Sequence, residues 1–214
     1  MGSSTILDIL GSSFVGGMLL LIMFRLNDAS VENSYTYAGN LIVQQNLVSI
    51  VEVINHDFNK IGYCEKWENM PDPLNAIISA TDTSISFLTD LSTPSHPYGD
   101  GIIDTLKYYS GSVSELTETP NPRDRILYRV EGNSIPGGSN LGVTYFKLSY
   151  FDVQGHLLSY PITTSKIRSI QIDLKLEDVY GYDTSNMDKE SYQERYADAI
   201  WKQLRISSPN LRNR

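Results

Sequence analysis

The chain has 214 residues, of which 41% are hydrophobic and 20% charged, a balance typical of a folded protein. A single cysteine excludes a disulfide framework within the chain. The formal net charge is -8 and no basic stripe is present to neutralise phosphates, so we expect no nucleic acid among the partners.

The first predicted element is a helix that spans a membrane, residues 1–26. Its apolar part is Ile6–Leu26, which includes Asp8 and a few small residues. At about 1.5 Å per residue, twenty-odd helical residues cross a hydrocarbon core of roughly 30 Å. A buried core helix is the alternative interpretation. A cleaved secretory signal fits poorly, because no Lys or Arg precedes the apolar run and no small-x-small site follows it.

We expect the helix to continue as an amphipathic segment, residues 27–61. Apolar side chains recur there every three or four positions, which places them in one stripe on a helix. They are Leu47, Ile50, Val51, Ile54, Phe58 and Ile61. Gly62 predicts a left-handed cap at the end of the helix. Residues 27–40 are more polar, so we expect the helix to loosen there, although no proline interrupts it.

Residues 62–214 are expected to form a globular, β-rich head. The clearest strand is 169–176, where Ile and Leu alternate with Ser, Gln, Asp and Lys. Other strand patterns lie within 76–110 (two or three strands) and at 124–130, 141–152 and 157–160. A short C-terminal helix is predicted over Glu190–Leu204. The fold class is therefore α+β, with the helical stripe covering one face of an antiparallel sheet.

Two segments resemble type IV pilin-like proteins, in particular minor pilins and minor pseudopilins of the W and J types. Ser4-Thr-Ile-Leu-Asp8 resembles a degenerate prepilin signature, with Ser3 and Ser4 at the positions of the cleaved Gly-Phe pair and Asp8 at that of the family's Glu. Ile54–Cys64 resembles the helix end of the family, where D-x-x-x-x-G-Y is a common run. The resemblance covers the layout of the whole chain, but its motifs lie in the first 65 residues.

The resemblance implies a pilin-like fold and several functional roles. Ser3 and Ser4 would be the processing site, and Asp8 would pair with the free amino terminus of a neighbouring subunit during assembly. The partners would be other pilin or pseudopilin subunits and the inner membrane, with the head in the periplasm or outside the cell. Arg25 alone disagrees with this topology, because it lies on the head side of the membrane span and the positive-inside rule would place it in the cytoplasm.

The sequence contains no catalytic motif, and we expect no enzymatic activity and no cofactor. The three histidines, His56, His96 and His156, are not spaced as metal ligands. Cys64 is expected to be a small buried side chain near the helix end.

A weak calcium candidate consists of Asp90, Asp100 and Asp104, because D-G-x-x-D supplies oxygen ligands. The spacing of an EF-hand is missing, however, and a tight Asp-Gly turn without a metal is our expectation.

The preferred function is therefore that of a structural subunit of a type IV pilus or a type II secretion-like filament, assembled through the N-terminal helix. The alternative is a membrane-tethered binding or adhesion protein whose head recognises a glycan, a cell surface or a secretion substrate. A tethered enzyme is the third hypothesis. A helix that continues from the span into the head favours the first, whereas a flexible linker within 27–40 would favour the other two.

Overall fold

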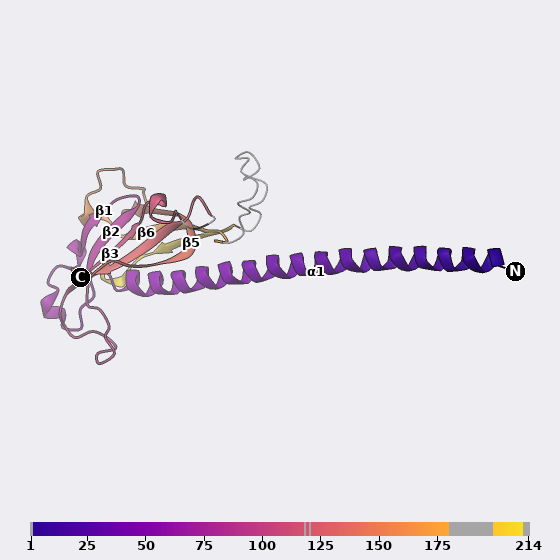
Figure 1. Ribbon diagram of the computed structural model, residues 1–214. Coiled ribbons are helices and arrows are strands. Elements are labelled where there is room, and N and C mark those ends of the chain that lie inside the picture. The colour runs from indigo at the N-terminus through magenta and orange to yellow at the C-terminus, as the bar shows by residue number, and fades with distance from the viewer. Residues whose placement is uncertain (1, 118, 120, 180–198, 212–214) are drawn as a thin grey trace. The chain divides into compact units, whose positions relative to one another are not determined.

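The structure, a computed structural model, describes residues 2–117, 119, 121–179 and 199–211 (Figure 1). One long helix, α1 (Gly2–Asn59), precedes seven strands. The strands are β1 (Ile77–Ala80), β2 (Ser84–Thr89), β3 (Asp104–Ser110), β4 (Arg125–Glu131), β5 (Gly137–Phe151), β6 (Ser169–Leu176) and β7 (Ile200–Ile206). The chain divides into two compact units, Met1–Leu41 and Ile42–Arg214, so the boundary falls inside α1.

Helix α1 is uninterrupted, and the loosening expected over residues 27–40 does not occur. The hydroxyls of Ser34 and Thr36 donate to the carbonyls of Ser30 and Glu32, at 2.8 and 3.1 Å, so these polar side chains are satisfied within the helix. Beyond the last helical residue, Gly62 adopts the predicted left-handed conformation, with a φ of 72°, but its N–H donates to the Leu88 carbonyl of β2 at 2.9 Å and not to a carbonyl of the helix.

The seven described strands form one antiparallel sheet in sequence order, β1 to β7. Strand β5 changes partner along its length, because its first residues pair with β4 and the rest pair with β6. Gly142 lies at the change, with a φ of 77°, and a Cβ there would come within 2.2 Å of the Glu177 carbonyl oxygen. Only glycine fits this position, where β5 turns from one neighbour to the next.

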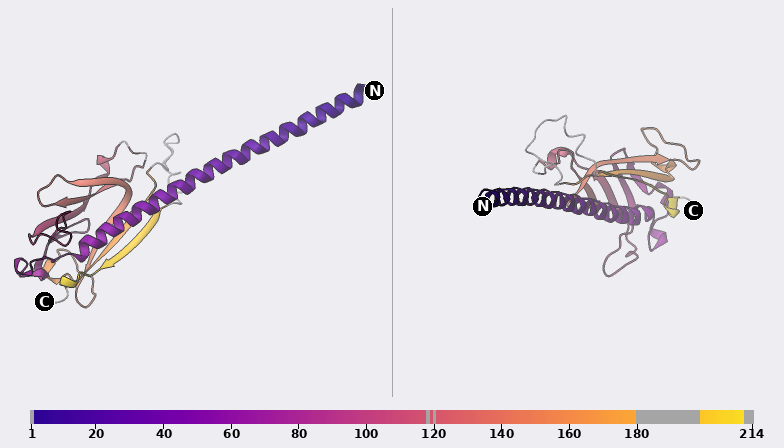
Figure 2. Two further views of the ribbon diagram at one scale, coloured as in Figure 1. Left: turned by 90° about the horizontal axis from the view of Figure 1, so that it is seen from below. Right: turned by 90° about the vertical axis from the view of Figure 1, so that its right-hand side faces the viewer.

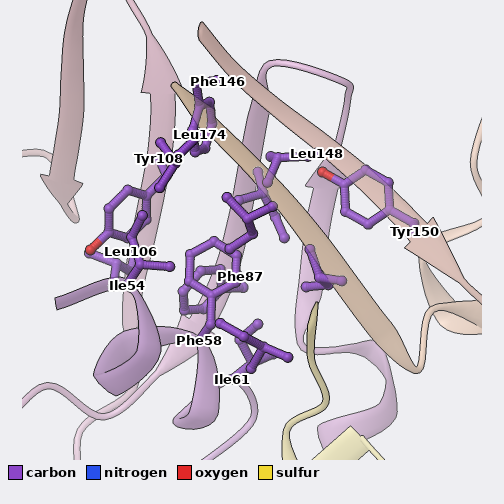
Figure 3. Close-up of a cluster of buried hydrophobic side chains, with 14 of the residues drawn as sticks. Ile54, Phe58, Ile61, Phe87, Leu106, Tyr108, Phe146, Leu148, Tyr150 and Leu174 are labelled. Atoms are coloured by element: carbon purple, nitrogen blue, oxygen red, sulfur yellow. The ribbon is translucent and has the colours of Figure 1, made fainter. Parts of the chain in front are cut away.

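The core lies between the second half of α1 and one face of the sheet. This second half of α1 runs along the sheet (Figure 2). From Val43 onward it contributes buried side chains that pack with those of β2, β3, β5 and β6 (Figure 3). Phe58 is central to this packing, since its ring lies 5.4 Å from that of Phe87 and 5.5 Å from that of Tyr108, centroid to centroid. The helical stripe therefore covers the sheet as the sequence predicts, and the α+β fold class is confirmed.

Two predicted elements differ from the structure. Residues 157–160 form no strand, and only Leu157 makes an isolated bridge, to Phe151. The helix predicted over Glu190–Leu204 lies partly outside the described residues, but from Ile200 onward it is wrong, because Ile200–Ile206 is strand β7. The strand conformation is stabilised by backbone pairing with β6, which gives β6 a partner on its second edge. At the two ends of this pairing, Leu176 is opposite Ile200 and Ile170 is opposite Ile206.

Candidate membrane and assembly segment

The first half of α1 presents an apolar surface. Fourteen large apolar side chains between residues 6 and 26 are each more than half exposed. An 18-residue window of the helix reaches a mean hydropathy of 2.1, and none of that window is buried. By length and composition, this one helix among the described residues could cross a membrane.

Two charged residues bracket the apolar part of the helix. Asp8 and Arg25 are both exposed, and the residues between them, Ile9–Phe24, carry no charge. Sixteen helical residues cover about 24 Å, which is shorter than a hydrocarbon core of roughly 30 Å. A span of roughly 30 Å would therefore include Asp8 or Arg25, or both, near its ends. Ser3 and Ser4 belong to the first turn of the same helix.

The second half of α1 carries a buried carboxylate, Asp57, whose side chain is 3% exposed. Its Oδ2 accepts hydrogen bonds from Arg129 Nε at 2.6 Å and from Tyr108 Oη at 2.5 Å. His56 Nδ1 lies 3.2 Å from Oδ1. Burial raises the pKa of the Tyr108 hydroxyl, and the Asp57 charge raises it further, so the hydroxyl remains a donor. The cluster joins the end of α1 to strands β3 and β4.

The sequence contained a signal for this cluster. Asp57 follows Ile54 by three positions and Ile50 by seven, so it falls on the buried stripe of the helix, where a carboxylate needs a partner. A groove of about 560 Å³ lies beside the cluster, where Val53 of α1 faces Leu127 and Leu141 of the sheet.

The structure gives the three calcium candidates hydrogen-bonding roles. Asp90 is fully buried, and its carboxylate accepts backbone N–H bonds from Glu65, Asp100 and Gly101 at 2.9–3.0 Å. Asp100 accepts the N–H of Ile102 at 2.8 Å, and Asp104 accepts that of Leu91 at 3.2 Å. These bonds hold the loop between β2 and β3 to the segment that follows α1. Among the described residues, no three of His, Cys, Asp and Glu are grouped to hold a metal ion.

No protein-family model and no curated protein sequence matches the chain. Among solved structures, it is similar to a type IV-like pilin from Thermus thermophilus, with a TM-score of 0.44 and 11% sequence identity. The match covers 79% of this chain and 98% of that one.

The histidines and the cysteine lie apart in the structure. His96 closes a small turn by a bridge to Thr93, and His156 Nδ1 lies 3.5 Å from Asp152 Oδ2. Cys64 is buried, as predicted, with its Sγ 3.7 Å from Asp90 Oδ2. Burial raises the pKa of this thiol, so it does not have the low pKa of a nucleophilic cysteine.

Proposed function

We propose that the chain is a membrane-anchored structural subunit of a pilus-like filament, of the minor pilin or minor pseudopilin type. The observation that supports this proposal is α1 itself, which is helical without a break from Gly2 to Asn59. Its first half is apolar and exposed, and its second half belongs to the core of the head. A tether for an independent enzyme or receptor is usually a flexible polar linker, which residues 27–40 are not.

The apolar half of α1 requires a non-aqueous environment. Transfer of one large apolar side chain from water to an apolar environment is favourable by about 1.5–3 kcal/mol of free energy. The fourteen exposed side chains between residues 6 and 26 would together disfavour an aqueous location strongly. Lipid covers this apolar surface before assembly, and the helices of neighbouring subunits cover it within a filament.

Asp8 is the residue that we assign to assembly. A carboxylate at the centre of a membrane costs roughly 2.5–3.5 kcal/mol, and less near the interface. Arg25 can extend its long side chain toward the headgroups, whereas the short side chain of Asp8 cannot. A positively charged amino terminus of a neighbouring subunit would compensate the Asp8 charge and set the axial register between the two helices. Processing between Ser3 and Ser4 would supply such an amino terminus, with the head on the outer side of the inner membrane.

Photo-crosslinking in native membranes tests the proposal. A photoreactive amino acid at Leu19, within the apolar half of α1, should yield adducts with proteins that themselves carry an N-terminal apolar helix and a pilin-type head. The control position is Ile135, which is 92% exposed and lies in the head. Adducts of Leu19 with lipid alone, in cells that assemble filaments, would show that the helix is only an anchor.

A further inference from the structure

A polar pocket of about 690 Å³ opens in the head beside the edge strand β7. Its walls come from the turn that follows β5, from the start of β6 and from the end of β7. Two arginines, Arg168 and Arg205, line it together with the carboxylate of Asp152. None of these side chains takes part in the assembly segment described above.

Both arginines are held in place by the protein. Arg205 donates from Nε to Ser169 Oγ at 3.3 Å, and its guanidinium lies 4.0 Å from the centre of the Phe151 ring. Arg168 donates from Nη1 to the carbonyls of Ser165 and Ile167 at 2.7 and 2.8 Å. A guanidinium that is already oriented loses little conformational entropy when it binds a ligand.

Two guanidinium groups and one carboxylate line the pocket, so positive charge is in excess there. Within the part of the chain that the structure describes, no carboxylate forms an ion pair with Arg168 or Arg205. The whole chain carries a net charge of -8, so acidic groups are in excess elsewhere. A planar guanidinium donates to a carboxylate or a phosphate by two parallel hydrogen bonds. The two guanidinium groups of the pocket are therefore suited to bind the anionic group of a ligand.

Asp152 narrows the class of ligand. Its Oδ1 accepts the N–H groups of Gln154 and His156 at 2.9 and 2.8 Å. The hydrogen bond from the His156 N–H is the main cause that lowers the pKa of this carboxyl, so it is ionised at neutral pH. An ionised acceptor beside two cations repels a bare anion but accepts hydrogen bonds from hydroxyl groups. A ligand with an anionic group at one end and hydroxyls at the other satisfies both.

We propose that this pocket binds an acidic sugar of the uronate class. The sugar carboxylate lies against Arg168 and Arg205, and ring hydroxyls donate to Asp152. Val153, which is 81% exposed at the pocket, offers an apolar contact to the C–H groups of the ring. The volume lies within the range of small-ligand pockets, about 300–1,000 Å³, and suits one or two sugar rings. This binding does not depend on whether the chain assembles into filaments.

Calorimetric titration of the full-length protein in detergent tests the proposal, with digalacturonate as the probe and neutral galactobiose and inorganic sulfate as comparisons. Digalacturonate should bind, and galactobiose should bind at least tenfold more weakly. Arg168→Gln and Arg205→Gln should each weaken digalacturonate binding about tenfold, as expected for the loss of a charge-assisted hydrogen bond. Lys147→Gln is the matched control, because it removes a positive charge from an exposed position of β5 outside the pocket.

Asp152→Asn separates a sugar site from a simple anion site. The asparagine Oδ1 can still accept both backbone N–H groups of the turn, so only the charge is lost. This variant should weaken digalacturonate binding while it strengthens sulfate binding, because the repulsion is removed. Equal strengthening of both ligands would overturn the proposal, as would undiminished binding in both arginine variants. Thermal melting of each variant verifies that the loss of binding does not come from unfolding.

Discussion

Asp57 of α1 and Arg129 of β4 form an ion pair of 2.6 Å beside the core, and the hydroxyl of Tyr108 shares the same carboxylate oxygen. The carboxylate is almost fully buried, whereas the arginine is 31% exposed. This arrangement links the helix to the sheet by a polar contact within a largely apolar interface.

Replacement of Asp57 should therefore destabilise the head strongly. Asp57→Ala leaves the Tyr108 hydroxyl and the Arg129 guanidinium without their shared acceptor, and breaking such a pair typically costs about 3–5 kcal/mol. Denaturant unfolding of the full-length protein in detergent measures the change. Glu131→Gln is the control, because Glu131 contacts the same arginine from an exposed position and should cost less than about 1 kcal/mol. Comparable losses in the two variants would contradict the role of Asp57.

Ile54→Asp should separate α1 from the sheet. Ile54 is 1% exposed in the middle of the helical stripe, so an aspartate there would be buried without a partner. We expect a loss of more than about 4 kcal/mol, seen as a melting temperature that falls by many degrees or as an insoluble product. Val48→Asp is the matched control on the same helix, since Val48 is 54% exposed. An unchanged melting temperature for Ile54→Asp would mean that the helix does not stabilise the head.

Asp124 should make the stability of the head depend on pH. Burial raises the pKa of this fully buried carboxyl from 3.8 to about 6. Between pH 4 and 6 the carboxyl of Asp124 therefore binds more protons in the folded state than in the unfolded state. The free energy of unfolding then decreases as the pH rises through this window. Asp124→Asn should raise stability by roughly 1–3 kcal/mol at pH 8 and change little at pH 4.

Melting temperatures of the wild type and Asp124→Asn across this pH range check the prediction. Glu68→Gln, at an exposed position, is the control for the loss of one negative charge. If the melting temperatures of the wild type and Asp124→Asn change with pH in parallel, the pH dependence of stability comes from another group.

Asp90 should stabilise its loop without calcium. Asp90→Ala removes the acceptor of three backbone N–H groups, at a cost of roughly 2–3 kcal/mol. The wild-type melting temperature should be the same in millimolar calcium and in chelator. A rise of several degrees with calcium that is reversed by chelator would refute this expectation.

Asp8 should be required for assembly and not for folding. Asp8→Ala removes a charge from the apolar segment, so membrane insertion should become easier, and the core of the head does not include this residue. The variant should accumulate in the membrane with a protease-resistant head, while its crosslinking to other subunits falls. Asp28→Ala, beyond the apolar segment, is the control. Normal filament incorporation of Asp8→Ala would show that Asp8 is only an interfacial acid.

The sequence predicts those helices and strands in which one face is buried, because their apolar residues then recur at a regular spacing. In β6, Ile170, Ile172, Leu174 and Leu176 are all buried, as their alternation predicts. The helical stripe likewise predicts that Ile50, Ile54, Phe58 and Ile61 enter the core. Such patterns are local, so one sequence suffices to recognise them.

The features that the sequence does not predict depend on partners distant in sequence. In β7, Ile200 and Leu204 are spaced as on a helix, and only pairing with β6 selects the strand. Asp57 acquires its role from Arg129, which lies 72 residues further along the chain. The two arginines of the pocket, Arg168 and Arg205, come together only when β6 and β7 are adjacent.

The end of α1 is completed by residues near the other end of the chain. The Ser208 hydroxyl donates to the carbonyls of Asn59 and Ile61 at 3.0 and 2.9 Å, and the Asn210 amide donates to Ile61 at 3.2 Å. During synthesis, the carbonyls of this helix end leave the ribosome almost 150 residues before the side chains that bind them. Contacts of such long sequence separation form late and slowly. A nascent chain that stops before β7 would carry an exposed apolar helix, an unpaired edge on β6 and an open helix end. Exposed apolar surface and unpaired strand edges make an incompletely folded chain prone to aggregation.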